Sequence, residues 1–189
     1  MKSIYFIAIM VLSVSVSCKT GKPLSGPEAV AVLPSEQPAA SVNYSDASTW
    51  IIGYFKINRL YQEPHSAWFI KGMDEYSFNR QAIDSLKAMN RDGVSIKIIL
   101  GTWCPDSRRE VPRFMRVLKE IDFPSDKVVF IGVDNVKFSP IDNYDALQIE
   151  RVPTFIFYKN NTEAGRIIEN PATSLEQDML NILARNAKL

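Results

Sequence analysis

The chain has two cysteines, and each lies where its neighbours give the sulfur a distinct chemistry. Cys104 follows the apolar run 95–101 and precedes an amphipathic stretch, so we expect it where a buried strand passes into a helix. Unpaired backbone N–H groups and the helix dipole stabilise a thiolate at a helix start, and the thiolate is the reactive form of cysteine. Arg108 and Arg109 would add to this effect, whereas Asp106 would oppose it. These residues predict a reactive thiol; a buried, inert thiol is the alternative.

Cys18 ends an N-terminal segment that has the features of an export signal. Lys2 supplies a basic start, residues 4–16 form an apolar run, and the small residue Ser17 precedes the cysteine. The run is shorter than the roughly 20 residues that a membrane-spanning helix needs. The segment resembles a bacterial lipoprotein signal, in which the cysteine is acylated and becomes the mature N-terminus, although Ser15 stands where leucine is usual. An ordinary cleaved signal or an uncleaved anchor is the alternative.

The chain beyond Cys18 divides into a polar segment and a globular part. Residues 19–45 are rich in Gly, Pro, Ser and Ala and show no periodicity, which is typical of a flexible linker. We therefore predict a leader over 1–18, a linker over 19–45 and one domain over 46–189. The expected location is the bacterial cell envelope, facing the periplasm from the inner or the outer membrane. With Cys18 acylated, Cys104 would be the only thiol and could form no internal disulfide.

Composition excludes several classes of function. Hydrophobic residues make up 46% and charged residues 23% of the chain, the balance of a soluble domain with a sizeable core. The formal net charge is +1 without a concentrated basic face, so we predict no nucleic-acid partner. His65 is the one histidine, so we predict no metal site built on the usual ligands. No glycine-rich phosphate loop is present, and we predict no cofactor.

The elements that must position Cys104 alternate between strands and helices. The predicted strands are 50–56, 95–101, 128–134, 154–158 and 165–169. The predicted helices cover 78–89, 111–121, 144–149 and a final segment opened by the capping pair Ser174 and Gln177. The order βαβαβαββα predicts an α/β fold with a central mixed sheet and helices on both faces.

Two separated motifs resemble the thioredoxin family over the chain from about residue 50 to its end. The first is 102–107, Thr-Trp-Cys-Pro-Asp-Ser, whose continuation through Glu110 and Pro112 is most similar to the exported thioredoxins of the TlpA/ResA kind. The second is 151–155, Arg-Val-Pro-Thr-Phe, followed by a turn at Asn160. The resemblance implies a thioredoxin fold, a central mixed sheet flanked by helices.

The same resemblance implies roles for individual residues. Pro153 would be cis and face Cys104, and the Val152 backbone would pair with an extended substrate chain. Trp103 and Pro105 would shape the surface around the sulfur, although packing alone also accounts for a tryptophan.

The chain departs from the family at positions that matter for turnover. Ser107 replaces the second motif cysteine, so an external thiol must resolve any mixed disulfide. Ile98 and Phe130 stand where the family has a buried acid and its lysine partner. Ser107 would either donate a hydrogen bond to the thiolate or serve only as a first-turn residue. Glu110 would either tune Cys104 or be a solvated carboxylate on the helix.

These observations support two main hypotheses of function, and whether the protein is an enzyme stays open between them. The first is an envelope-anchored monothiol protein that engages protein or small-molecule disulfides and oxidised thiols through Cys104. The second is a non-catalytic module of the same fold that binds an extended peptide or a partner protein. A thiol peroxidase is a weaker third reading, because Gly101 stands where peroxiredoxins have threonine.

Overall fold

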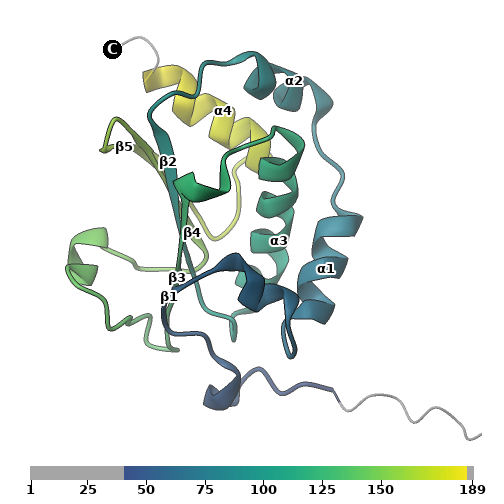
Figure 1. The fold of residues 1–189 in the computed structure, drawn as a ribbon, viewed down its shortest axis with the longest axis vertical. Helices are drawn as coiled ribbons and strands as arrows, with labels where there is room; N and C mark the ends of the chain where they lie inside the picture. The colour runs from purple at the N-terminus through teal and green to yellow at the C-terminus, as the bar shows by residue number, and fades with distance from the viewer. Residues whose placement is uncertain (1–40, 187–189) are drawn as a thin grey trace, which may run out of the picture. The chain divides into compact units, whose positions relative to one another are not determined.

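Five strands form one mixed sheet in the order β1-β3-β2-β4-β5 (Figure 1). In the computed structural model, which describes residues 41–186, the strands are β1 (Gly53–Phe55), β2 (Val94–Leu100), β3 (Val128–Gly132), β4 (Thr154–Lys159) and β5 (Thr162–Ile168). Strands β2 and β3 are parallel, and the other neighbouring pairs are antiparallel. The predicted α/β class, the mixed sheet and the final hairpin are confirmed. The predicted leader, most of the linker and Cys18 lie outside the described residues.

Four α-helices accompany the sheet: α1 (Ser66–Glu75), α2 (Arg80–Ala88), α3 (Pro105–Glu120) and α4 (Leu175–Asn186). Side chains cap two of them. Ser174 accepts the N–H of Gln177, as expected from the sequence, and Asn79 accepts the N–H of Ala82. Helix α1 was not predicted from the sequence. None of the helices among residues 41–186 is both long enough and apolar enough to cross a membrane.

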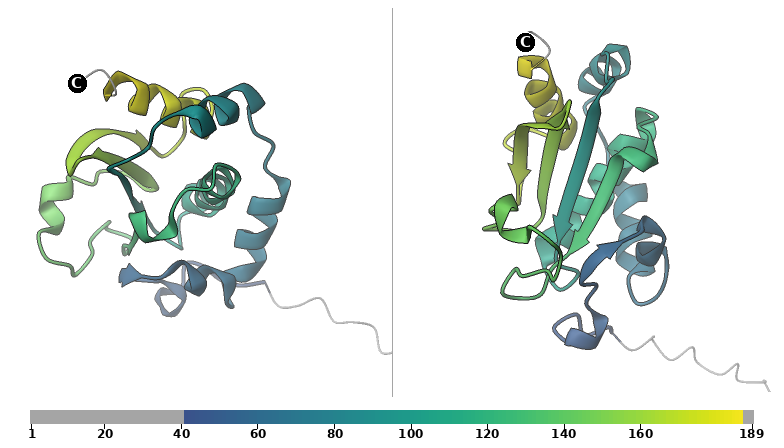
Figure 2. Two further views of the ribbon diagram at one scale, coloured as in Figure 1. Left: turned by 45° about the horizontal axis from the view of Figure 1, so that its top comes forward. Right: turned by 60° about the vertical axis from the view of Figure 1, so that its left-hand side comes forward.

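The two faces of the sheet are covered differently. Alternate residues of β2, such as Ile96 and Ile98, pack into a large apolar core with all four α-helices. Ile99 points to the other face and packs into a smaller cluster with the segment between β3 and β4. That segment lies on the opposite side of the sheet from α3 (Figure 2, left). The larger core stabilises the fold, and the smaller cluster contains Cys104.

The face of the sheet that carries the smaller cluster differs from the expectation of helices on both faces. The predicted helix over 144–149 is present only as the short 3-10 helix η4 (Tyr144–Leu147). Left-handed backbone at Lys137, Asn143 and Gln148 interrupts the segment before and after η4. Because a regular α-helix needs consecutive right-handed residues, this chain cannot extend η4 into a longer helix.

Helices α1 and α3 approach closely because of a glycine. A Cβ atom on Gly72 would lie 2.5 Å from Cγ of Pro112, so only a residue without a side chain allows this packing. Pro112 lies inside α3, where it removes one backbone hydrogen bond. The contact holds α3, and with it the position of Cys104, against the rest of the helical layer.

Candidate functional site

Cys104 is the N-cap residue of α3, at the end of the turn that follows β2. Its backbone is extended, its N–H donates to the carbonyl of Gly101 at 2.9 Å, and Pro105 takes the first helical position. The thiol makes no capping bond to the helix, and the residue is 7% exposed. The prediction that a strand ends and a helix begins at this cysteine is confirmed. The exposure is small, so the sulfur lies at the edge of the apolar cluster rather than on an open surface.

The two separated motifs meet at the thiol. The Val152–Pro153 peptide bond is cis, and Sγ of Cys104 donates to the carbonyl oxygen of Val152 at 3.3 Å. Val152 itself is buried. The isomer and the approach of this loop to Cys104 are those that the resemblance implied.

Trp103 and Pro105 flank the sulfur in different ways. The Trp103 indole N–H donates to the carbonyl of Val133 at 3.1 Å, which attaches the turn to the end of β3. A Cβ atom on Gly101 would lie 2.5 Å from this indole, so the glycine leaves room for it. Trp103 is half-buried and packs near Trp50, whereas Pro105 is exposed. Trp103 therefore has a packing role, and Pro105 is the part of the motif that a partner could touch directly.

Ser107 is fully buried under the turn. Its hydroxyl oxygen accepts the backbone N–H of Gly101 at 3.3 Å. Among the described residues this is the hydrogen bond recorded for the Ser107 side chain. The structure therefore favours the role of a first-turn residue, which stabilises the turn before Cys104, over a hydrogen bond to the thiolate.

Glu110 was expected either to tune Cys104 or to be solvated, and its burial argues against the solvated role. The carboxylate is buried and accepts hydrogen bonds from Arg109, at 2.6 Å, and Arg113, at 3.0 Å. The hydrogen bond that Arg109 donates to Glu110 is the main cause that raises the pKa of Arg109 above its ordinary value. Arg109 also reaches Asp106 and Asn170, so Glu110 and Arg109 connect α3 to the chain that follows β5. The distance along the sequence to Asn170 explains why no local pattern indicated this role.

Arg108 holds the turn before the cysteine. Its guanidinium donates to the carbonyl oxygens of Thr102, at 3.0 Å, and Trp103, at 2.7 Å. It also stacks on the ring of Tyr44 at 4.4 Å, and Tyr44 falls within the predicted linker. The positive charge therefore lies on the backbone side of the turn, and its recorded contacts are with carbonyls.

His65 is buried behind the same tyrosine. Its ring stacks with Tyr44 at 6.3 Å, and burial lowers its pKa, helped by the charges of Arg59 and Arg108. A neutral imidazole in this position contributes packing to the domain. No group of three or more His, Cys, Asp or Glu side chains in residues 41–186 is arranged to hold a metal ion.

Ile98 and Phe130, the two positions where the resemblance would place a buried acid and a lysine, are apolar neighbours. Ile98 and Phe130 are register partners on β2 and β3, and both are buried. The pairing of β2 with β3 places these two positions side by side. Both side chains pack into the larger apolar core, on the face of the sheet away from the cluster that holds Cys104.

Residues from the segment between β3 and β4 complete the surroundings of the sulfur. The cluster on this face joins Cys104 to the following buried residues: Ile99, Ile131, Val133, Tyr144, Leu147, Val152 and Ile156. The Tyr144 hydroxyl donates to the carbonyl of Lys137 at 2.6 Å, and burial, followed by the charges of Asp134 and Asp145, raises its pKa to about 12. Sequence analysis did not single out Tyr144, because only the fold brings its segment to Cys104.

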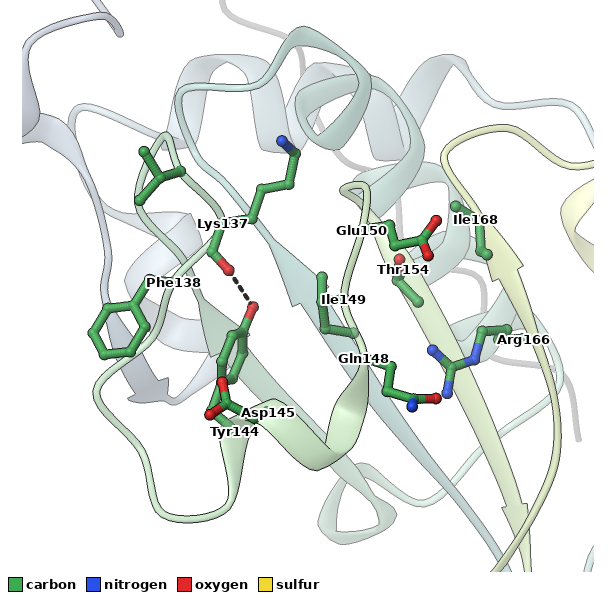
Figure 3. Close-up of a pocket in the computed structure, with 11 residues that line it drawn as sticks. Lys137, Phe138, Tyr144, Asp145, Gln148, Ile149, Glu150, Thr154, Arg166 and Ile168 are labelled. Carbon is green, nitrogen blue, oxygen red and sulfur yellow. Dashed lines mark hydrogen bonds between the residues drawn. The ribbon is translucent and has the colours of Figure 1, made fainter.

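A cavity of about 770 Å³ lies between this segment and the outer strands (Figure 3). Its walls include Phe138 and Tyr144 on one side and Thr154, Arg166 and Ile168 on the other. Thr154 directly follows the cis proline, so the cavity adjoins the loop that contacts Cys104.

Comparisons with known proteins identify no family. No family model matches the chain, and no curated protein matches it. One similar solved structure is a protein of unknown function from Pseudomonas aeruginosa, with a TM-score of 0.46 and 13% identity over 67% of this chain and 76% of that one. A likeness this distant carries no argument, so function must be inferred from the site itself.

Proposed function

We propose that the protein is a thioredoxin-fold, monothiol redox protein that engages disulfides or oxidised thiols through Cys104. The observation that carries the proposal is the 3.3 Å contact between Sγ of Cys104 and the carbonyl of Val152, next to the cis bond to Pro153. A helix start and a proline loop converge on one sulfur, although the two lie far apart in the sequence. Their convergence supports a site built around the thiol.

The reaction that fits is thiol–disulfide exchange. The Cys104 thiolate attacks one sulfur of a client disulfide, a new S–S bond forms, and the other client sulfur leaves as a thiolate with the electron pair. Ser107 has no thiol, and its hydroxyl is bonded under the turn, so it cannot release the adduct. A second, external thiol must attack the mixed disulfide and return Cys104 to its reduced form.

The proposal includes the location inferred from the sequence. Acylation of Cys18 would anchor the chain to a bacterial envelope membrane, and the domain would face the periplasm. Protein or small-molecule thiols and disulfides would be the partners in that compartment.

The test is recovery of the full chain from its own envelope under non-reducing conditions after acid quenching. We expect Cys104 to carry clients in a disulfide that dithiothreitol releases, detected by mass spectrometry of the Cys104 peptide. A chain with Cys104→Ser is the matched control and should carry none. Absence of adducts on the natural chain, before and after mild oxidation, would contradict redox activity.

A second candidate is a binding module without chemistry, which the low exposure of Cys104 favours. Here the groove beside Val152 and Pro153 would hold a partner segment and the thiol would serve as packing. In this case Cys104→Ala would leave partner binding intact, and substitutions at Val152 would abolish it. The redox proposal predicts that Cys104→Ala removes the covalent complexes.

A further inference from the structure

We propose that the cavity beside the cis-proline loop binds a large apolar side chain of a client polypeptide, two positions from the cysteine that Cys104 attacks. The inference rests on the proposed function and names its substrate class: extended protein segments rather than small disulfides. The cavity of about 770 Å³ lies within the size range of ligand pockets, roughly 300–1,000 Å³.

The rim of the cavity presents apolar side chains to solvent. Val136 is 73% exposed, the highest value among the large hydrophobic residues that the structure describes, and Phe138 is 52% exposed. Ile168 on β5 lies on the facing wall and is also exposed. Apolar groups gathered around a hollow gain free energy when a partner's apolar side chain covers them.

The walls of the cavity carry charges of both signs, with Lys137 and Arg166 on one hand and Asp145 and Glu150 on the other. Arg166 is held by two hydrogen bonds to Glu163, at 2.7 Å each, so its charge is matched within the protein. The half-buried Lys137 has no ion pair among those recorded for residues 41–186. Asp145 and Glu150 line the same cavity and would repel an acidic group, so the charges of the walls give no preference for an acidic client.

The separation along the chain between the thiol contact and the cavity wall determines which client residue would occupy the cavity. Cys104 contacts Val152, and Thr154 on the cavity wall is two residues further along the chain. Two residues of extended chain span at most about 7 Å, and side chains two positions apart point to the same side. An extended client bonded to Cys104 and lying along this loop would therefore place its residue two positions away over the cavity. A small disulfide would be too short to reach it.

The reaction of the full chain with three probes tests this. The probes are a short peptide whose cysteine carries thionitrobenzoate and has Phe two positions away, the same peptide with Ser in place of Phe, and Ellman's reagent alone. In each case the Cys104 thiolate forms a disulfide and thionitrobenzoate leaves as the coloured thiolate. A chain with Cys104→Ser measures the background from Cys18.

We expect the Phe peptide to react at least about tenfold faster than the Ser peptide, the effect of burying one large apolar side chain. Phe138→Ala should remove most of this preference. Phe138→Ala should leave the rate with Ellman's reagent unchanged. Tyr54→Ala, an exposed aromatic on β1 outside this cavity, is the matched control and should change none of the rates.

Two outcomes overturn the inference and are distinguishable. Equal rates for the two peptides, unaffected by Phe138→Ala, would show that Cys104 reacts without this cavity; the proposed function would stand and the substrate class would be wrong. No release by any probe above the Cys104→Ser background would refute both.

Discussion

The two faces of the sheet show how stability and chemistry are separated in this protein. One face is buried under four α-helices and is lined by fully buried aromatic and branched side chains. The other has only the 3-10 helix η4 and its flanking loops over it, and it holds the thiol, the cis-proline loop and the cavity. The comparison teaches that the less completely covered face is where a partner can approach. It also predicts that substitutions on the two faces act on different measured properties.

The largest expected difference is between two phenylalanines. Phe114 is fully buried in α3 and packs against Phe155, with ring centroids 4.6 Å apart. Phe114→Ala should lower the free energy of unfolding by about 3–5 kcal/mol, measured by urea denaturation. Phe138→Ala on the open face should change it by no more than about 0.5 kcal/mol. A comparable loss of unfolding free energy at both positions would contradict the separation of stability and chemistry between the two faces.

A second pair makes the same chemical change on each face. Gly72→Ala would drive a Cβ atom against Pro112 and separate α1 from α3, at a cost of about 1–3 kcal/mol in unfolding free energy. Gly101→Ala would instead displace the Trp103 indole next to Cys104. We expect Gly101→Ala to change the alkylation rate of Cys104 several-fold, and Gly72→Ala to leave that rate unchanged in the folded protein. If Gly72→Ala changed the alkylation rate and Gly101→Ala did not, the helical layer would control the reactivity of Cys104.

Features that neighbouring residues encode could be predicted from the sequence, and features formed by segments distant in sequence could not. The alternation of apolar residues along β2 indicated a buried strand, and the cysteine at its end was correctly placed at a helix start. Helix α1 escaped detection because its two buried residues, Phe69 and Met73, are too few for a clear helical period. The ion pairs of Glu110 and the position of Tyr144 depend on segments distant in sequence, so no local pattern could predict them.

The smallest expected effect concerns Tyr144 at alkaline pH. Burial raises its pKa from 10.0 to about 12, so the folded protein keeps the phenolic proton where the unfolded chain loses it. Its contribution to stability is intact below pH 10 and is lost as the pH rises toward 12, by at most about 1.4 kcal/mol per pH unit. Tyr144→Phe should reduce this slope in urea midpoints measured between pH 9 and 11, and the exposed Tyr54→Phe should not. An unchanged slope would show that Tyr144 is not closed off from solvent.

The most direct test of the central claim is the alkylation rate of Cys104 with iodoacetamide at neutral pH, compared between the folded and the urea-unfolded full chain. Mass spectrometry of the separate peptides would distinguish Cys104 from Cys18. The redox proposal predicts that Cys104 reacts faster in the folded protein than in the unfolded chain, despite its low exposure. A slower reaction in the folded protein would mean that the sulfur is sealed in its apolar cluster, and it would contradict the redox function.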